Sequence, residues 1–233
     1  MSQNEVNNID PFIVKISKSI CELKMETKSG IIYGIGFLLK DDFDQENFYY
    51  LITNEQLITN DIINHNNSIS ISFNNGNKII NIKLNDKKRY IKSFKDIGLD
   101  ITAIELLEED NIPHDYFLLY ENESLINNGL IKNEINILHY NNKKDLIFDI
   151  GEIKEINNHE FIFKTNKVYD SLGILIFLEK GDHVLGIYKR SNKNKMENYA
   201  DFIAPVFDVI KNDIQKKRNK GKYLKGKFIW DDG

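Results

Sequence analysis

Short runs of apolar or alternating residues recur along the chain, and most are bounded by Asn, Asp or Gly. They are rich in β-branched and aromatic side chains, a pattern typical of strands joined by turns. The runs are Ile13–Ile20, Ile31–Leu39, Phe48–Ile52, Ile69–Phe73, Lys78–Leu84, Ile101–Leu107, Ile135–Tyr140, Leu146–Ile150, Phe161–Lys164, Ile174–Leu178 and Val184–Tyr188. About a dozen short strands over roughly 200 residues predict a barrel or a pair of barrels.

One helix is predicted near the end of the chain. Pro205 suits a first helical turn, and an apolar stripe at helical spacing follows it. The stripe consists of Val206, Phe207, Val209, Ile210 and Ile214, and Lys211, Asp213 and Lys216 lie on the other face. We expect this helix to pack against the body of the protein.

Composition excludes several classes of protein. The 233 residues include 31 Lys and Arg against 35 Asp and Glu, and 41% are hydrophobic, so neither a disordered chain nor a globally basic nucleic-acid binder is indicated. The single cysteine, Cys21, excludes an internal disulfide framework and a four-cysteine zinc site. Uncharged stretches are too short to cross a bilayer, and the polar first ten residues carry no apolar signal core. We expect a cytoplasmic protein without a membrane span.

Positive charge is concentrated at 211–227, where eight basic residues accompany one acidic residue. We expect a solvated helix face and linker, because the run lacks the interleaved aromatic residues with which single-strand binders stack bases. The alternative is a basic tail that contacts an acidic partner, a membrane surface or nucleic acid. Outside this basic segment, 211–227, we expect no contact with nucleic acid.

Three segments in the first half of the chain carry a family resemblance: Ser19–Leu39, SICELKMETKSGIIYGIGFLL, Tyr49–Ile58, YYLITNEQLI, and Leu99–Leu106, LDITAIEL. They resemble the trypsin-like (chymotrypsin-fold) serine peptidases. The first leads into the second as the family's G-x-G-F-L leads into L-I-T-N-x-H-V-I with its general-base histidine, and the third is similar to the strand start that holds the orienting aspartate.

The resemblance continues in the second half. Asp170–Leu178, DSLGILIFL, stands where the family writes the nucleophile turn G-x-S-G-S-P-I-F-L, and Val184–Lys189, VLGIYK, follows as V-I-G-I-H-K does. Asn198–Pro205, NYADFIAP, then leads into the helix. The resemblance implies an all-β fold of two six-stranded antiparallel β-barrels with a C-terminal α-helix.

The resemblance also implies boundaries along the chain. Lys220–Gly233, KGKYLKGKFIWDDG, is similar to part of a MORN-type repeat, with a simple hairpin or tail as the alternative. We expect an N-terminal tail at 1–12, an N-terminal barrel at 13–112, an inter-barrel linker at 113–130, a C-terminal barrel at 131–205, the helix at 206–219 and a basic MORN-like tail at 220–233.

The residues at the family's catalytic positions cannot perform peptidase chemistry. The base position holds Gln56, whose amide takes up no proton near neutral pH, and the nucleophile position holds Leu172, which has no heteroatom. Asp100 alone remains of the triad. Asp170 replaces the oxyanion-hole glycine and adds negative charge where an oxyanion would need stabilising.

The specificity pocket implied by the resemblance has changed as well. Phe163 falls at the pocket histidine and Lys167 at the pocket threonine, whereas Gly173 is retained. We expect the cleft between the barrels to be lined by Phe163, Lys167, Tyr169, Ser171, Gly173 and His139.

A displaced catalytic site is not expected. Ser171 precedes Leu172 by one residue, so its side chain would point to the opposite side of a strand turn. The possible relocated bases are His65, His114, His139, His159 and His183, none of which falls at the family position. His159-Glu160 lacks the second histidine of a zinc helix, and Gly34–Gly36 lacks the third glycine of a dinucleotide loop, so we expect no metal and no cofactor.

The sequence thus predicts a catalytically inactive, protease-like domain that binds a protein or an extended peptide, for example by adding a strand to an exposed edge. The alternative is a repurposed hydrolase in the same cleft. A viral nuclease acting on a cyclic dinucleotide has a trypsin-like scaffold and uses His, Tyr and Lys. The corresponding candidates here are His139, Tyr140, Tyr169 and Lys167.

Overall fold

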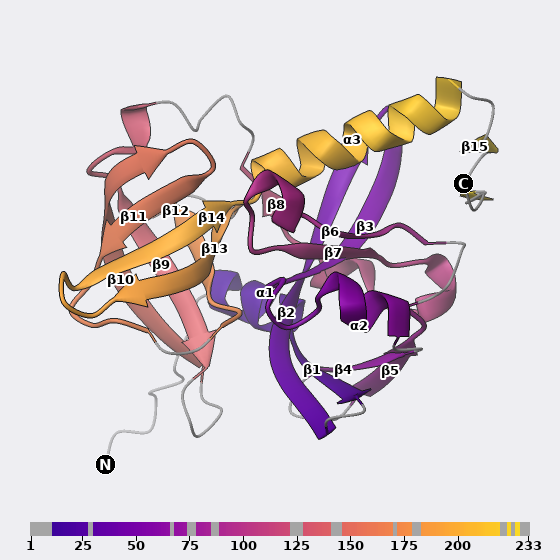
Figure 1. Cartoon of the computed structure of the whole chain (residues 1–233), viewed down its shortest axis with the longest axis horizontal. Helices are drawn as coiled ribbons and strands as arrows, with labels where there is room; N and C mark the ends of the chain where they lie inside the picture. Colours follow the sequence, from indigo (N-terminus) through magenta and orange to yellow (C-terminus); the bar gives the residue numbers. More distant parts are fainter. Residues whose placement is uncertain are drawn as a thin grey trace, which may run out of the picture.

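The structure is a computed structural model of the chain. It describes residues 11–27, 30–65, 68–73, 78–84, 89–121, 128–140, 146–169, 172–178, 183–219, 223–224 and 227–228. In this part of the chain strands dominate, and two bodies of strands lie side by side with a long helix across the top of one of them (Figure 1).

The first body is a seven-stranded antiparallel sheet in the order β5-β4-β1-β2-β3-β7-β6. Its strands are β1 (Ile20–Thr27), β2 (Gly30–Phe43), β3 (Glu46–Thr53), β4 (Ile69–Phe73), β5 (Lys78–Ile82), β6 (Ile91–Ser93) and β7 (Thr102–Glu105). Asp44 and Gln45 join β2 to β3 with φ of 54° and 66°, as a two-residue hairpin turn of type I′ requires.

The second body is a closed barrel. Its strands are β9 (Glu134–Tyr140), β10 (Leu146–Asn157), β11 (Glu160–Lys164), β12 (Leu175–Leu178), β13 (His183–Asn192) and β14 (Glu197–Phe202). The order β12-β9-β10-β11-β14-β13 returns to its start because β12 also pairs with β13. The short strand β8 (Leu119–Tyr120) runs parallel to β13 and connects the barrel to the first body.

The helices and turns complete the fold. The α-helices are α1 (Pro11–Ser19), α2 (Asn60–His65) and α3 (Ala204–Asn219), and the 3₁₀ turns are η2 (Lys95–Ile97), η3 (Glu108–Asp110), η4 (His114–Tyr116) and η6 (Asn128–Leu130). Near the end of the chain β15 (Tyr223–Leu224) pairs with β16 (Lys227–Phe228). The other residues of the MORN-like segment 220–233 lie outside the described residues, so the repeat stays a prediction.

The predicted fold class is confirmed: an all-β protein of two strand bodies with a C-terminal helix. The first body differs in detail, since it has seven strands whose outer members, β5 and β6, are not paired with each other among the described residues.

The strand predicted at Ile13–Ile20 is wrong, because the chain forms helix α1 there and β1 begins at Ile20. Pro11 occupies the first helical position, where its missing N–H costs nothing. Ile13, Ile16 and Ile20 are spaced by three and four residues, which is a helical period, and Ile16 is fully buried.

One hydrophobic cluster joins both bodies to α3. It includes Phe37 and Tyr50 from the first sheet, Leu138 and Phe177 from the barrel, and Phe207 from the helix. The Phe207 ring stacks on Tyr120 at 4.0 Å and meets Tyr50 edge-on at 5.6 Å. Because these side chains share one core, α3 holds the two bodies in a fixed arrangement.

Several cations of α3 are paired with carboxylates of the first sheet. Arg218 contacts Asp44 and Glu46, both at the β2–β3 hairpin, with Nη2 lying 3.0 Å from Glu46 Oε2. Lys211 Nζ lies 3.2 Å from Asp41 Oδ1, whose carboxylate is buried. This part of the basic segment is therefore an internal contact surface and not simply a solvated face.

No helix in the described part of the chain is long and apolar enough to span a membrane.

Candidate functional site

Gln56 and Asp100, which the sequence predicts at the positions of the general base and the orienting aspartate, are in direct contact. Gln56 Nε2 donates to Asp100 Oδ2 over 2.7 Å, and the Gln56 backbone N–H donates to Asp100 Oδ1 over 3.0 Å. Asp100 is nearly buried and Gln56 is exposed. The carboxylate thus accepts a bond of the kind that orients an imidazole in a Ser-His-Asp triad, but the donor is an amide, which takes up no proton near neutral pH.

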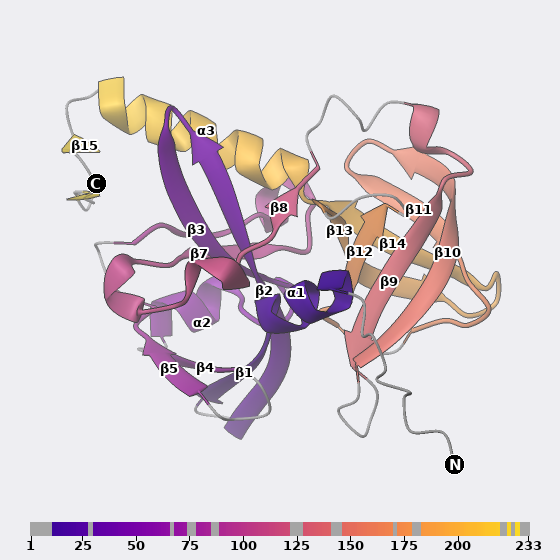
Figure 2. The same cartoon turned by 180° about the vertical axis from the view of Figure 1, so that it is seen from behind.

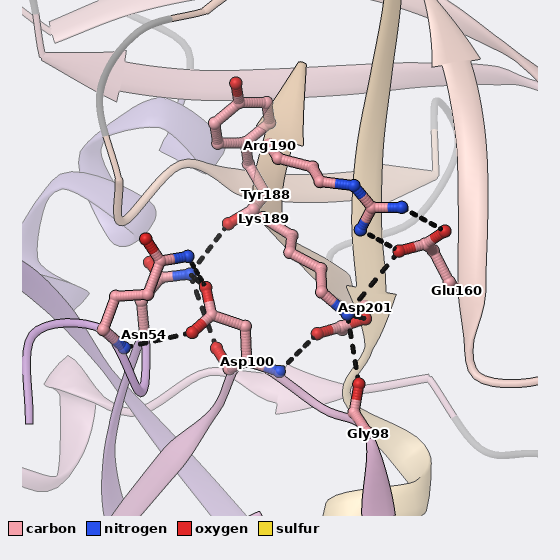
Figure 3. A network of polar contacts seen from close by, with 9 residues as sticks. Asn54, Gly98, Asp100, Glu160, Tyr188, Lys189, Arg190 and Asp201 are labelled. Carbon is pink, nitrogen blue, oxygen red and sulfur yellow. Dashed lines mark hydrogen bonds and ion pairs between the residues drawn. The ribbon is translucent and has the colours of Figure 1, made fainter. Parts of the chain in front are cut away.

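Asn54, two residues before Gln56, connects the first sheet to the barrel. Its Nδ2 donates to Asp100 Oδ2 at 3.0 Å and to the Tyr188 carbonyl at 2.9 Å, while its Oδ1 accepts from the Gly173 N–H at 2.8 Å. The side chain is fully buried, and Figure 3 shows its contacts with Asp100 and the Tyr188 carbonyl. A buried amide with all these partners satisfied is a rigid link, because breaking any one bond leaves an unpaired polar group.

A second buried carboxylate extends the network into the barrel. Asp201 Oδ2 accepts from the Asp100 N–H at 2.6 Å, and its Oδ1 lies 3.1 Å from Lys189 Nζ. Lys189 also donates to the Gly98 carbonyl at 3.1 Å, and Glu160 lies close to the same ammonium (Figure 3). Burial raises the pKa of Asp201 above its ordinary value, although the Asp100 N–H and the Lys189 ammonium partly oppose this shift.

Gly173, the glycine of the predicted nucleophile turn, packs tightly against the first sheet. Gly173 has φ of +80°, and a Cβ there would lie 2.5 Å from the Cβ of Ile35 on β2. Only glycine fits at this position, so Leu172 beside it has a defined place near Asn54. Asp170 and Ser171, the other residues of the predicted turn, lie outside the described residues.

Three of the predicted cleft residues converge on one carboxylate. Asp149 Oδ2, on β10, lies 2.9 Å from His139 Nε2, 2.8 Å from Lys167 Nζ and 3.1 Å from the Tyr169 hydroxyl. Burial acts to raise the pKa of Asp149, but the bonds from Lys167, His139 and Tyr169 outweigh it and hold that pKa below its ordinary value. We call these four residues the Asp149 cluster.

The Tyr169 hydroxyl of the cluster is held as a neutral donor. Burial and the neighbouring Asp149 carboxylate raise its pKa above the ordinary value. The backbone carbonyl of Tyr169 accepts from the Tyr188 hydroxyl at 2.5 Å, and the rings of the two tyrosines meet edge-on at 5.8 Å. The side chain of Tyr140, the remaining candidate of the hydrolase alternative, lies outside the described residues.

Phe163 was expected to line the cleft, but its ring lies in the barrel core. Its side chain is fully buried and packs with Phe161 and Tyr169 inside the barrel. On a strand of alternating burial such as β11, this position points into the core, so the Phe163 ring does not face a ligand.

The other histidines are placed away from Asp100. His65 contacts the Asp61 carbonyl within α2, His183 lies 3.6 Å from Glu121, and the His159 carbonyl accepts from the Phe202 N–H. The His114 ring lies against Tyr49. No group of three or more His, Cys, Asp or Glu that could hold a metal ion occurs among the described residues.

Two residues of the site were not singled out from the sequence. Asn54 is part of the quoted segment YYLITNEQLI, and its position between a strand and the base position was the available signal. Asp149 lies in the run Leu146–Ile150 as one polar residue among apolar ones, a pattern that many exposed strand residues share.

The fold is that of the chymotrypsin-like proteases. No protein-family model matches the sequence, and a search of curated proteins also found no match. Among solved structures, the chain is similar to the catalytically active tobacco etch virus protease bound to product, with a TM-score of 0.56, 15% identity and coverage of 81% of this chain and 74% of that one.

Two further structures show the range of the likeness. An active-form protease from M. tuberculosis has a TM-score of 0.57, 13% identity and coverage of 85% and 82%. A scabies mite inactivated protease paralogue has a TM-score of 0.58, 12% identity and coverage of 88% and 97%. Because active and inactivated proteases match equally well, the likeness establishes the two-body fold, and the chemistry must be argued from the residues.

Proposed function

We propose that this chain is a chymotrypsin-fold domain without peptidase activity that binds an extended peptide or protein segment. The observation that carries the proposal is the bond from Gln56 Nε2 to Asp100 Oδ2 at 2.7 Å. An amide occupies the place of the general base, and Leu172, beside Gly173, offers no nucleophilic atom.

The polar groups around the former catalytic centre support a structural role. The Asn54 amide joins Asp100 to the Gly173 N–H and the Tyr188 carbonyl. These buried groups satisfy one another's hydrogen bonds, and none of them is a nucleophile or a base near neutral pH other than the Asp100 carboxylate. This arrangement favours a rigid scaffold between the two bodies over a reacting centre.

An apolar row on β2 supports peptide binding. Ile35 lies beside Gly173, and Tyr33 and Ile31 follow at alternate positions on the same face of the strand. Tyr33 is 67% exposed and Ile31 is 51% exposed. Exposed apolar residues in a row on a strand are a surface on which a peptide side chain gains burial.

The test is to pass a mixture of random-sequence decapeptides over the immobilised protein and to analyse the bound fraction by mass spectrometry. We expect enriched decapeptides that remain intact. An Ile31→Lys/Tyr33→Lys variant should retain at least tenfold less peptide, whereas Met196→Lys, an exposed position on the β13–β14 turn, should behave like the wild type. New peptide termini would refute the loss of peptidase activity. Equal retention by all three proteins would refute binding at β2.

A second candidate function rests on the Asp149 cluster. His139, Lys167 and Tyr169, which were predicted for a repurposed hydrolase, share the carboxylate of Asp149. A carboxylate that orients an imidazole beside an ammonium and a phenol is a combination capable of acid–base chemistry on a phosphodiester.

This candidate is tested with a panel of linear and cyclic dinucleotides, with product formation followed by chromatography. Turnover that is lost in His139→Ala and Lys167→Ala but kept in Lys195→Ala, an exposed lysine on the barrel, would establish the hydrolase. Absence of turnover by the wild-type protein would exclude this activity on the dinucleotides tested.

A further inference from the structure

Two adjoining hollows lie beside the segment that connects the two bodies. The first, of about 370 Å³, is lined mainly by the connecting segment from Leu106 to Phe117 together with Tyr49 of β3. The second, of about 360 Å³, lies between α1, β2 and η4. His114 and Phe117 line both, so the two hollows are neighbours that share these side chains. We call the pair of hollows the His114 groove.

The first hollow is mostly apolar. Leu106, Ile112 and Pro113 line it, and the Tyr49 ring lies 4.6 Å from Phe117 and 4.9 Å from His114. Glu108, an exposed residue, is also part of the lining. A space of this size bounded by aliphatic and aromatic side chains suits one bulky apolar side chain.

The second hollow is basic. Lys15, Lys18 and Lys40 line it, with Asp115 as the only carboxylate among the lining residues, all of which are described. Lys18 Nζ lies 2.9 Å from Asp115 Oδ2. Counted by residue type, the lining holds three lysines and one carboxylate, and an anionic group of a ligand gains from this positive balance.

We propose that the His114 groove binds a peptide segment in which a bulky apolar residue stands next to acidic residues. The apolar side chain fills the hollow at Tyr49, and the carboxylates lie among the lysines across His114. Side chains two positions apart in an extended peptide point to the same face and lie about 6.6 Å apart, so an apolar side chain and an acidic one at that spacing can enter neighbouring hollows. This site is additional to the exposed row of Ile31 and Tyr33, which we call the β2 surface, because Gln56, Asp100 and Tyr33 line neither hollow.

The views of the whole chain agree with this separation. Helix α1, which forms one wall of the groove, faces the viewer in Figure 2, whereas α2, which follows the Asn54–Gln56 segment, faces the viewer in Figure 1. A peptide in the His114 groove therefore leaves the former catalytic side accessible.

The experiment measures fluorescence anisotropy with a fluorescein-labelled nonapeptide that has a central tryptophan and aspartates on both sides. Two control peptides carry lysines in place of the aspartates or alanine in place of the tryptophan. We expect saturable binding of the first peptide, at least tenfold weaker binding of the lysine peptide and at least fivefold weaker binding of the alanine peptide. Binding of the first peptide should weaken as salt is added.

Variants of the protein locate the site. Lys15→Glu/Lys40→Glu should weaken binding at least tenfold, and the neutral Lys40→Gln should weaken it less. Lys195→Glu, which changes an exposed lysine on the barrel, should bind like the wild type. Thermal melts check whether each variant is folded. If the double variant does not fold, Lys40→Gln takes its place in the comparison.

The results separate this proposal from the proposed function. Ile31→Lys/Tyr33→Lys should keep full affinity for the acidic peptide, because neither residue lines the groove. No binding of the acidic peptide by the wild-type protein, equal binding of the aspartate and lysine peptides, or unchanged affinity in the variants at Lys40 would each overturn the His114 groove. None of these outcomes bears on the β2 surface.

Discussion

The Gln56 side chain donates to Asp100 Oδ2 over 2.7 Å. Under the proposed function, Gln56 stands at the position of the general base, and this bond replaces the one between imidazole and carboxylate in an active serine peptidase. The same carboxylate also accepts from Asn54. Asp100 therefore accepts hydrogen bonds from both Asn54 and Gln56, and we expect it to contribute to the free energy of unfolding.

Asn54→Ala should strongly destabilise the protein. The substitution leaves the buried Gly173 N–H and the Tyr188 carbonyl without the Asn54 side chain. Unsatisfied buried groups cost about 1–3 kcal/mol each, so the free energy of unfolding should fall by about 2–4 kcal/mol in urea titrations. Gln56→Ala, at an exposed side chain, should cost only about 0.5–1.5 kcal/mol. Equal losses in the two variants would contradict the role of Asn54 as the link between the bodies.

Gln56→His should place an imidazole against Asp100 without producing peptidase activity. The neighbouring carboxylate stabilises the charged imidazole, so its pKa should lie above the ordinary value of about 6.5 in an NMR titration. The variant combined with Asp100→Asn is the control, and its imidazole should titrate at a lower pH. Peptide cleavage by Gln56→His alone would show that a residue other than Leu172 supplies the nucleophile.

Gly173→Ala should destabilise the protein by more than Gly98→Ala. Both glycines have positive φ, 80° and 86°, so both substitutions incur the strain of a left-handed backbone, about 1–2 kcal/mol. Only at Gly173 would the new Cβ meet a neighbour, Ile35, at 2.5 Å, whereas nothing lies within 4 Å at Gly98. Thermal or urea unfolding of the two variants separates the steric cost from the backbone cost, and equal costs would exclude a tight contact at Ile35.

Stability should fall as the pH rises between about 4.5 and 7 because of Glu105. Burial raises the pKa of this carboxyl from 4.5 to about 7, although the Tyr90 N–H and Arg89 partly oppose the shift. In that interval the folded protein holds a proton that the unfolded chain has released, so raising the pH favours unfolding. The contribution is fully present below pH 4.5 and is lost by about pH 7; a shift of this size corresponds to at most about 3 kcal/mol.

Glu105→Gln removes this titration and is the matched variant, since an amide oxygen still accepts from the Tyr90 N–H. The free energy of unfolding of wild type minus that of the variant should decrease from pH 4.5 to 7. Titrations elsewhere, such as that of Asp201, occur in both proteins and cancel in the difference. A difference that does not change with pH would show that Glu105 titrates normally.

Sequence alone sufficed for the fold class, because alternating β-branched residues define strands locally and the quoted segments occur in the order of the peptidase fold. The assignment of Gln56, Asp100 and Leu172 to the catalytic positions of that fold stays a prediction from the same segments. The apolar stripe at Phe207 and Ile210 likewise predicted the helix α3, because a helical period of this length is a local signal.

Tertiary structure alone decided which groups those residues contact. The bonds of Asn54 reach across 46, 119 and 134 residues of chain, and those of Asp149 to Lys167 and His139 arise from strand register and a loop. No local pattern encodes such partners. The nine-residue run of α1 was misassigned for a related reason: so short an apolar segment fits either period, and burial of Ile16 in the core determines the helix.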